Sequence, residues 1–323
     1  MHWIKNIFWD GRQNRLRSGW RLGLQMFLFF IILIILAIIT NMVGSNFGMA
    51  AVGSLAYLAG GLGSVWLMAR LVDHRPFADY GFHLDRAWWL DFVFGLFLGA
   101  FLLSGIFLTE RIVGWVTVTG TAVTDYPLPF ALAFLISTLL YIAVGVNEEL
   151  VFRGYQLKNL AEGLVGERIG PRVAIVLAFL ISSTLFGLAH ISNDNTSLAS
   201  TINLILAGFL LSLPFLLTGE LALSIGLHIT WNLFEGTVYG FAVSGSVPQT
   251  HLLAIQQNGP EFWTGGAFGP EAGLLCILWM LVGCGLIALW VKFRRQRLGL
   301  HLPLAKYGTG EMEENTFKGN EVA

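Results

Sequence analysis

The sequence predicts an all-α protein, a polytopic membrane bundle of about eight transmembrane helices. Of the 323 residues, 55% are hydrophobic and only 12% are charged, whereas an ordinary soluble domain has about 25% charged residues. The apolar runs are continuous and about twenty residues long, which is the length that a membrane-spanning helix needs. A membrane β-barrel would instead show segments of about ten residues with alternating polarity. The composition therefore favours a helical membrane protein over a soluble domain or a barrel.

Eight apolar segments are long enough to cross a bilayer. They cover residues 22–43, 49–70, 90–108, 128–150, 172–190, 198–217, 221–242 and 272–291. We expect a basic N-terminal segment over 1–21, a transmembrane domain over 22–292 and a cytoplasmic tail over 293–323. The N-terminal segment combines basic and aromatic residues, which is typical of a segment in the membrane interface near anionic lipid. An unstructured basic segment fits the same pattern.

The positions of the basic residues predict how the chain is oriented in the membrane. Of the 19 Lys and Arg residues, only Arg111 falls in an odd-numbered connection between the predicted spans. The others precede the first span, follow the last one, or lie in the second and fourth connections. Because short cytoplasmic connections carry an excess of Lys and Arg, we expect an integral, multi-pass protein with both termini in the cytoplasm. Eight spans agree with two termini on one side.

Glycines within two of the predicted spans indicate close contacts between helices. Gly95 and Gly99 lie four residues apart in the third span, and small residues at this spacing let two helix backbones approach each other. Gly60, Gly61 and Gly63 in the second span likewise indicate a close helix contact. We interpret these positions as packing rather than chemistry.

Two adjacent glutamates follow a long apolar run, in the sequence NEELVFR over residues 147–153. Ionisable groups at membrane depth are costly, and they usually face a cavity or a partner. On a helix, Glu149 and Arg153 share a face and can form an ion pair. Glu148 is turned about 100° away from Glu149, so it remains free to meet water. An ion pair at the end of a helix is the alternative interpretation.

Two later apolar segments each carry a histidine with a partner four residues away. Phe186 and His190 share a face of the fifth predicted span, and His228 and Asn232 share a face of the seventh. Polar groups deep in a bundle need partners, since an unsatisfied polar group costs several kcal/mol in hydrocarbon. A hydrogen bond at the membrane interface is the alternative for His190. Polar contacts between helices are the alternative for His228 and Asn232.

Together these side chains suggest a hydrolytic site that holds one water molecule. Glu148 is expected to take the proton of this water as a general base, while the histidines orient the water or bind a metal. Asn232 can donate to the oxyanion of a cleaved amide. The sequence has no His-Glu-x-x-His helix, no Gly-x-Ser-x-Gly elbow and no Asp pair in facing spans. This argues against the common zincin, serine-hydrolase and aspartyl mechanisms.

The order and spacing of these residues resemble the CPBP family, which comprises CAAX proteases and bacteriocin-processing enzymes and is also called the ABI family. The family is marked by Glu-Glu-x-x-x-Arg, Phe-x-x-x-His and His-x-x-x-Asn/Asp, in that order. The resemblance covers about residues 125–240. The matching residues are Glu148, Glu149, Arg153, Phe186, His190, His228 and Asn232, with Phe152 and Gly154 beside the arginine.

The resemblance implies an intramembrane endopeptidase with a mostly helical, eight-span fold and a protease-like core over 125–240. It implies that Glu148 is the base that activates water and that His190 is its partner on that water. It also implies that His228 and Asn232 bind the oxyanion, with Glu149 and Arg153 as supporting residues.

The resemblance leaves the cofactor open. The family is often described as metalloproteases, so one divalent metal such as zinc is one expectation, with Glu148, His190 and His228 as candidate ligands. Asn232 would be an unusual zinc ligand, because zinc prefers nitrogen, sulfur and carboxylate donors. Activation of water by Glu148 and His190 without a metal is the other expectation, and we favour it.

The expected partners are membrane lipids and a protein or peptide substrate, which is lipid-modified in the family's eponymous case. A net charge of −1 gives no indication of a nucleic-acid partner. A non-catalytic immunity or scaffold protein of the same family is an alternative function. A transporter that uses the buried glutamates as a proton relay is another.

The predicted site requires a particular offset between two helices. If every span began and ended at the membrane surface, Glu148 and His190 would lie about 27 Å apart at 1.5 Å per residue. A fourth helix that continues to about residue 163, followed by a fifth that begins near 174, would place both residues at similar heights above their shared turn. We therefore predict this offset.

Overall fold

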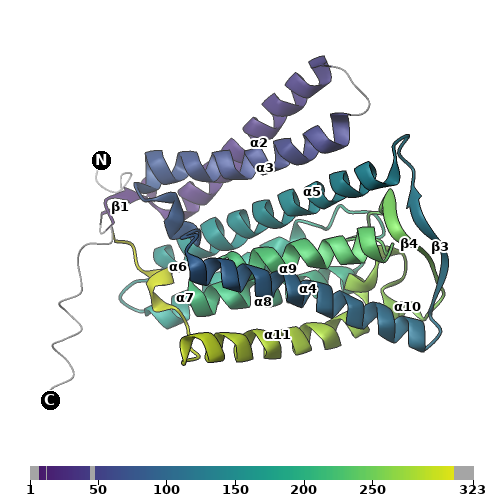
Figure 1. The fold of residues 1–323 in the computed structure, drawn as a ribbon. Helices are drawn as coiled ribbons and strands as arrows, with labels where there is room; N and C mark the ends of the chain where they lie inside the picture. Colours follow the sequence, from purple (N-terminus) through teal and green to yellow (C-terminus); the bar gives the residue numbers. More distant parts are fainter. Residues whose placement is uncertain (1–6, 12, 44–47, 309–323) are drawn as a thin grey trace.

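The computed structural model describes residues 7–11, 13–43 and 48–308, and long apolar helices make up most of it (Figure 1). Seven helices in these residues are long and apolar enough to cross a membrane. The helices run roughly side by side. β1 (Trp9–Asp10) and η7 (Leu302–Ala305) lie at one end of the bundle, here called the terminal end. β3 (Val116–Thr124) and β4 (Thr250–Gln257) lie at the other, called the strand end. The predicted all-α membrane bundle is confirmed.

Eight helices build the bundle within the described residues, and short helical turns connect several of them. The eight are α2 (Ser18–Val43), α3 (Gly48–Met68), α4 (Arg86–Ile112), α5 (Phe130–Glu148), α7 (Pro171–Leu188), α8 (Leu198–Thr218), α9 (Ala222–Asn232) and α11 (Leu274–Arg295). The shorter elements are η1 (Ala69–Asp73), η2 (Phe77–Tyr80), η3 (Glu149–Leu157), α6 (Lys158–Leu164), η4 (Leu233–Val238), α10 (Glu261–Thr264), η5 (Gly266–Phe268) and η6 (Pro270–Ala272).

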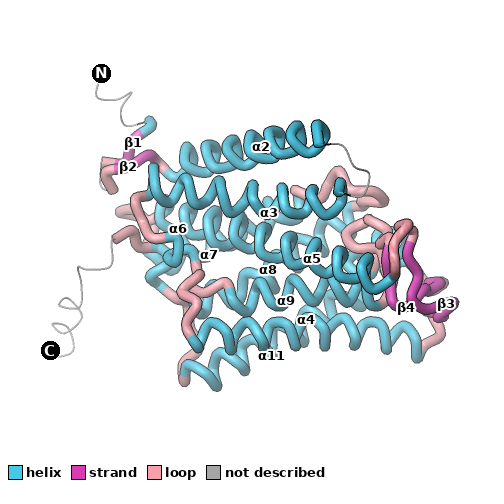
Figure 2. Tube along the Cα trace, turned by 45° about the horizontal axis from the view of Figure 1, so that its top comes forward, coloured by secondary structure: helices cyan, strands magenta, loops and turns pink. Residues whose placement is uncertain are grey.

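Strands occur only at the two ends of the described bundle (Figure 2). β1 pairs with β2 (Arg15–Leu16) in an antiparallel hairpin at the terminal end. β3 pairs with β4 in an antiparallel ribbon at the strand end, with Val116 opposite Gln257 and Thr124 opposite Thr250. The ribbon joins the segment after α4 to the long connection before α11, so it organises the loops at that end.

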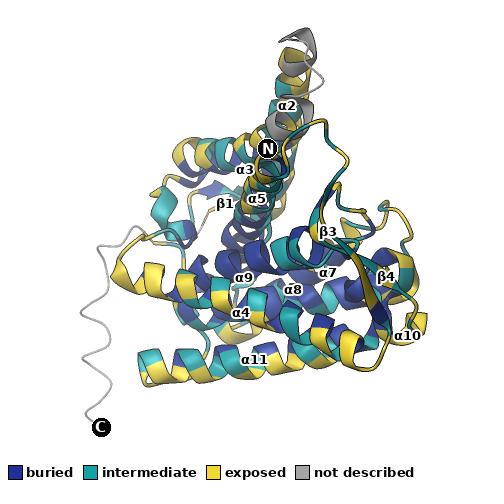
Figure 3. Ribbon diagram, turned by 45° about the vertical axis from the view of Figure 1, so that its right-hand side comes forward, coloured by how far each residue is buried: buried dark blue, intermediate teal, exposed yellow. Residues whose placement is uncertain are grey.

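The predicted span over 221–242 is wrong in its length. α9 has only 11 residues and continues as the six-residue π-helix η4. All residues of α9 are buried, because α4, α5 and α8 pack around it, and Figure 3 shows this buried centre. Apolar residues here contact protein rather than lipid, so the thickness of the bilayer does not set the length of the helix.

The predicted contacts at the glycines of α4 are confirmed. A Cβ atom added at Gly95 would collide with the carbonyl oxygen of Leu223, and one at Gly99 would collide with that of Leu227. On α9, Gly226 meets the carbonyl oxygen of Phe92 in the same way. Glycines on both helices therefore bring their backbones into direct contact and fix the position of α9.

α5, η3 and α6 form one continuous helix over Phe130–Leu164. The next helix, α7, begins at Pro171 and ends at Leu188, two residues before His190. At 1.5 Å per residue, Glu148 lies about 24 Å and His190 about 29 Å from the shared turn. The predicted offset is therefore confirmed. The middle of the long helix is π-helical from Glu149 onward, and π-helical segments are frequent at functional sites.

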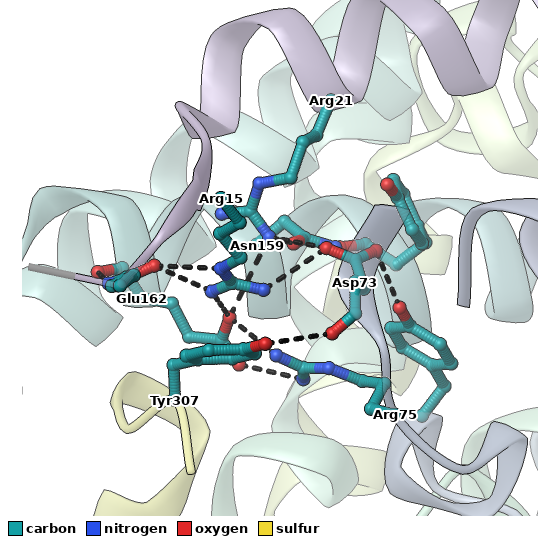
Figure 4. A network of polar contacts seen from close by, with 10 residues as sticks. Arg15, Arg21, Asp73, Arg75, Asn159, Glu162 and Tyr307 are labelled. Carbon is teal, nitrogen blue, oxygen red and sulfur yellow. Dashed lines mark hydrogen bonds and ion pairs between the residues drawn. The ribbon is translucent and has the colours of Figure 1, made fainter. Parts of the chain in front are cut away.

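A buried ionic cluster occupies the terminal end (Figure 4). Arg15 pairs with both Asp73 and Glu162, Arg21 lies 2.7 Å from Asp73, and Arg75 lies 2.8 Å from Glu162. Burial alone would lower the pKa of the Arg75 guanidinium, but Glu162 raises it above its ordinary value. The expectation that the cations of 1–21 lie near lipid headgroups is wrong for Arg15 and Arg21, because both pair with buried carboxylates inside the protein.

The predicted cytoplasmic tail begins as a packed segment. α11 continues to Arg295, and Leu304 and Ala305 in η7 are buried. The guanidinium of Arg15 lies 3.5 Å from the centre of the Tyr307 ring. Lys5, Arg12 and Lys318, and the tail beyond residue 308, lie outside the described residues.

Candidate active site

One cavity of about 370 Å³ brings the four predicted catalytic side chains together. Glu148 comes from the end of α5, His190 from the turn after α7, and His228 and Asn232 from α9. All four line this cavity. Its apolar lining includes Leu204, Ala207, Leu210 and Leu211 of α8 and Trp231 of α9. The cavity thus combines a few polar groups with an apolar lining, which is typical of a ligand site.

Glu149 and Arg153 form the buried ion pair that their spacing predicts. Nη1 of Arg153 lies 3.0 Å from Oε1 of Glu149, and both side chains are fully buried. Nε of Arg153 donates to Oγ of Ser212 at 3.2 Å, and Nη2 donates to the carbonyl oxygen of Gly208 at 3.3 Å. The guanidinium also lies 4.3 Å from the centre of the Phe186 ring. Arg153 therefore connects the long helix to α8 and α7.

His228 lies between the two glutamates. Its Nδ1 is 2.8 Å from Oε1 of Glu149, and its Nε2 is 3.8 Å from Oε2 of Glu148. A carboxylate can only accept, so Nδ1 carries the hydrogen and donates to Glu149. Nε2 consequently faces Glu148. The gap of 3.8 Å exceeds a direct hydrogen bond, so Nε2 of His228 is not bonded to Glu148.

His190 and Asn232 present their polar groups to the same space. Nδ1 of His190 lies 2.8 Å from the carbonyl oxygen of Phe186. A carbonyl accepts, so Nδ1 donates and Nε2 keeps its lone pair. The side-chain amide of Asn232 forms no hydrogen bond within the described part of the chain. Phe186 separates the two histidines, with its ring centre 5.0 Å from that of His190 and 6.2 Å from that of His228.

The candidate metal ligands do not form a metal-binding group. Within the described residues, no three His, Cys, Asp or Glu side chains lie close enough together to hold one ion. This includes Glu148, His190 and His228. One nitrogen of each histidine is already bonded to a protein oxygen, so only Nε2 of each ring faces the cavity. We therefore derive no step through a metal.

Tyr57 of α3 is a site residue that the sequence analysis missed. Its hydroxyl donates to Oε1 of Glu148 at 3.1 Å. On the other side of the same helix contact, Asn147 is buried against Gly61, where any Cβ atom would collide with its side-chain oxygen. α3 therefore approaches α5 closely enough for Tyr57 to hold one oxygen of Glu148, while the other faces His228.

The Tyr57→Phe variant tests this positioning role. A hydrogen bond to a charged group contributes about 1.5–3 kcal/mol, and about 1.4 kcal/mol corresponds to a tenfold change in rate. We expect kcat for peptide cleavage to fall roughly tenfold with little change in KM, because the hydroxyl orients Glu148 and does not hold substrate. Tyr239→Phe removes a comparable bond, to Ser104, away from the cavity and is the control. Equal rates for both variants and the parent protein would contradict this role.

Comparison with protein families identifies the segment that carries the site. Residues 129–234 match the family model described as Rce1-like, type II CAAX prenyl endopeptidase. This segment contains all three motifs, from Glu148 to Asn232. The search of curated proteins and the search of solved structures each gave no match.

Proposed function

Because residues 129–234 match the Rce1-like family model of type II CAAX prenyl endopeptidases, we propose that this protein is an intramembrane endopeptidase. It hydrolyses a peptide bond in a membrane-associated protein or peptide. The observation that carries the proposal is the arrangement of Glu148, His190, His228 and Asn232 around one cavity. These residues come from three segments that are far apart in the sequence.

Glu148 is the proposed general base. A water molecule between Glu148 and Nε2 of His190 loses a proton to the carboxylate, and its oxygen attacks the carbonyl carbon of the scissile bond. The carboxylic acid then returns this proton to the nitrogen of the leaving amine as the C–N bond breaks. Glu148 is suited to this exchange because its contacts, the Tyr57 hydroxyl and the more distant His228, leave part of the carboxylate facing the cavity.

His228 and Asn232 are the proposed oxyanion-binding pair. The Asn232 amide donates directly. When the His228 ring is protonated, Nδ1–H donates to Glu149 and Nε2–H donates into the cavity, towards the developing negative charge. Glu149 and Arg153 support this arrangement, since Arg153 fixes the carboxylate that orients the ring. Removing one oxyanion donor typically costs about 10²–10³ in kcat.

Substrate trapping tests the proposed function in cells. New protein termini in the membrane fraction would be compared between the full-length parent protein, Glu148→Gln and Glu167→Gln. Glu167 is exposed in the turn before α7, so its variant is a matched control. We expect one or more membrane proteins to be cut with the parent and with Glu167→Gln, and to remain intact, bound to Glu148→Gln. Identical termini in all three samples would favour a non-catalytic immunity or scaffold role.

The purified protein in lipid bilayers tests the role of a metal. Once a cleaved peptide is known, its cleavage is measured before and after treatment with a strong chelator. Activation of water by Glu148 alone predicts the same rate in both samples. Loss of cleavage that is restored by zinc would overturn this assignment of the water-activating group.

A further inference from the structure

The cavity opens at the strand end of the bundle. Its rim comes from the connections that meet there, and includes Tyr126, Asn193, Ser244, Val247, Gln249 and Glu271. Hydrogen bonds join three of these connections. Nδ2 of Asn193 donates to the carbonyl oxygen of Ser244 at 2.8 Å, and the backbone N–H and Oγ of Ser244 donate to Oε2 of Glu271 at 2.8 and 2.6 Å. The rim is therefore an ordered frame.

The terminal end is closed beneath the site. Tyr155, Leu157, Phe215 and Leu221 lie on this side of Glu148 and Arg153, and all four are fully buried. The buried ionic cluster described above lies beyond them, at the end of the bundle where Arg15 stands in β2, paired with β1. Within the described residues, two packed layers thus separate the cavity from the terminal end.

Charge distinguishes the two ends of the bundle. At the strand end, Arg111 is the single Lys or Arg among the described residues. The terminal end carries many, and they include Arg17, Arg70, Arg86, Arg168, Arg172 and Arg297. The excess of Lys and Arg in short connections marks the cytoplasmic side. Arg15, Arg21 and Arg75 contribute to this excess although they form ion pairs, because the positive-inside rule counts Lys and Arg rather than net charge.

From these observations we infer that the candidate site is entered from the outer face of the membrane, opposite the cytoplasmic terminal end. Where the site cleaves peptides, which rests on the proposed function, its substrates present the scissile bond from that outer face. The substrate class is then an exported peptide, or the outward part of a membrane-anchored protein. A lipid-modified tail held at the cytoplasmic leaflet would meet the closed end instead.

Cysteine labelling tests the sidedness without requiring activity. Cys276 and Cys284 are replaced by alanine, and single cysteines are introduced as Val247→Cys at the rim and Leu298→Cys after α11. Both positions are exposed. A membrane-impermeant maleimide should label Val247→Cys in intact cells and Leu298→Cys only in inside-out vesicles. The reverse pattern, or labelling of both positions from one side, would overturn the inference. Leu198→Cys, exposed at the strand end, should repeat the result for Val247→Cys.

Different results would refute the proposed proteolytic function and the proposed side of entry. If the cysteine-free protein does not accumulate, the same substitutions are made with Cys276 and Cys284 retained, and the parent protein gives the background. If the cysteines are labelled as expected but no cleavage is detected, the proposed proteolytic function is refuted and the proposed sidedness stands. If cleavage depends on Glu148 but the cleaved bonds of the substrate lie on the cytoplasmic side, the proposed function stands and the proposed sidedness is refuted.

Discussion

Replacing Glu148 by alanine is expected to abolish peptide cleavage while the protein still folds and inserts. General acid–base catalysis contributes about 10²–10⁴-fold to a rate, so we expect kcat/KM to fall by at least about 100-fold. The side chain is only 12% exposed, yet within the described part of the chain its single direct hydrogen bond is the one from Tyr57. Its loss therefore removes the base without breaking the buried ion pair of the adjacent Glu149.

The measurement is the initial cleavage rate of the purified variant in lipid bilayers, with the thermal unfolding midpoint recorded on the same sample. Glu148→Gln keeps the size of the side chain and removes its basicity, so it should lose the same activity. Glu167→Ala is the control for replacing a glutamate elsewhere. A Glu148→Ala variant that unfolds like the parent and cleaves at the same rate would exclude Glu148 as the base.

Replacing Arg153 by alanine is expected to destabilise the whole bundle. Removing one partner of a buried ion pair costs about 3–5 kcal/mol, because the remaining charge stays buried without compensation. Among the described residues, Glu149 would keep only His228 as a partner. Ser212 and Gly208 would lose the donor that connects α8 to the long helix. We expect a low yield of folded protein, a lower unfolding midpoint and reduced cleavage.

A double substitution separates the charge effect from a packing effect. Glu149→Gln removes the charge that Arg153→Met would leave unpaired, and glutamine can still accept from Nδ1 of His228. The double variant should therefore be more stable than Arg153→Met alone, and a double-mutant cycle measures the coupling. Strictly additive losses, or a normal yield and rate for Arg153→Ala, would contradict a supporting role for this pair.

Helical periodicity accounts for what the sequence predicted about the site. Residues four apart share a face, so the pairing of Glu149 with Arg153 followed from spacing alone. The offset that brings Glu148 and His190 to one height followed from the requirement that they share a water molecule. Tyr57 could not be found in this way, because periodicity gives the face of a helix but not the neighbour that the face meets.

The surroundings of α9 and of the N-terminal arginines could not be predicted, because residues in different surroundings show the same sequence pattern. Apolar residues in α9 contact protein, but hydropathy does not distinguish protein from lipid. Arg15 and Arg21 pair with carboxylates that lie far along the chain, yet basic residues near headgroups look the same in sequence. β3 has a detectable signal, since Val116–Thr124 is rich in the β-branched residues that strands favour.

The cluster at the terminal end has a consequence for biosynthesis. It joins Arg15 to Tyr307, which is synthesised much later in the chain. The Tyr307 ring stacks on the Arg15 guanidinium, and its hydroxyl donates to the carbonyl oxygen of Asp73 at 3.0 Å. Asp73 and Glu162 are thus inserted long before their surroundings are complete. The cluster is therefore complete only after Tyr307 has been synthesised, and a nascent chain that stops short of Tyr307 lacks the ring that covers Arg15.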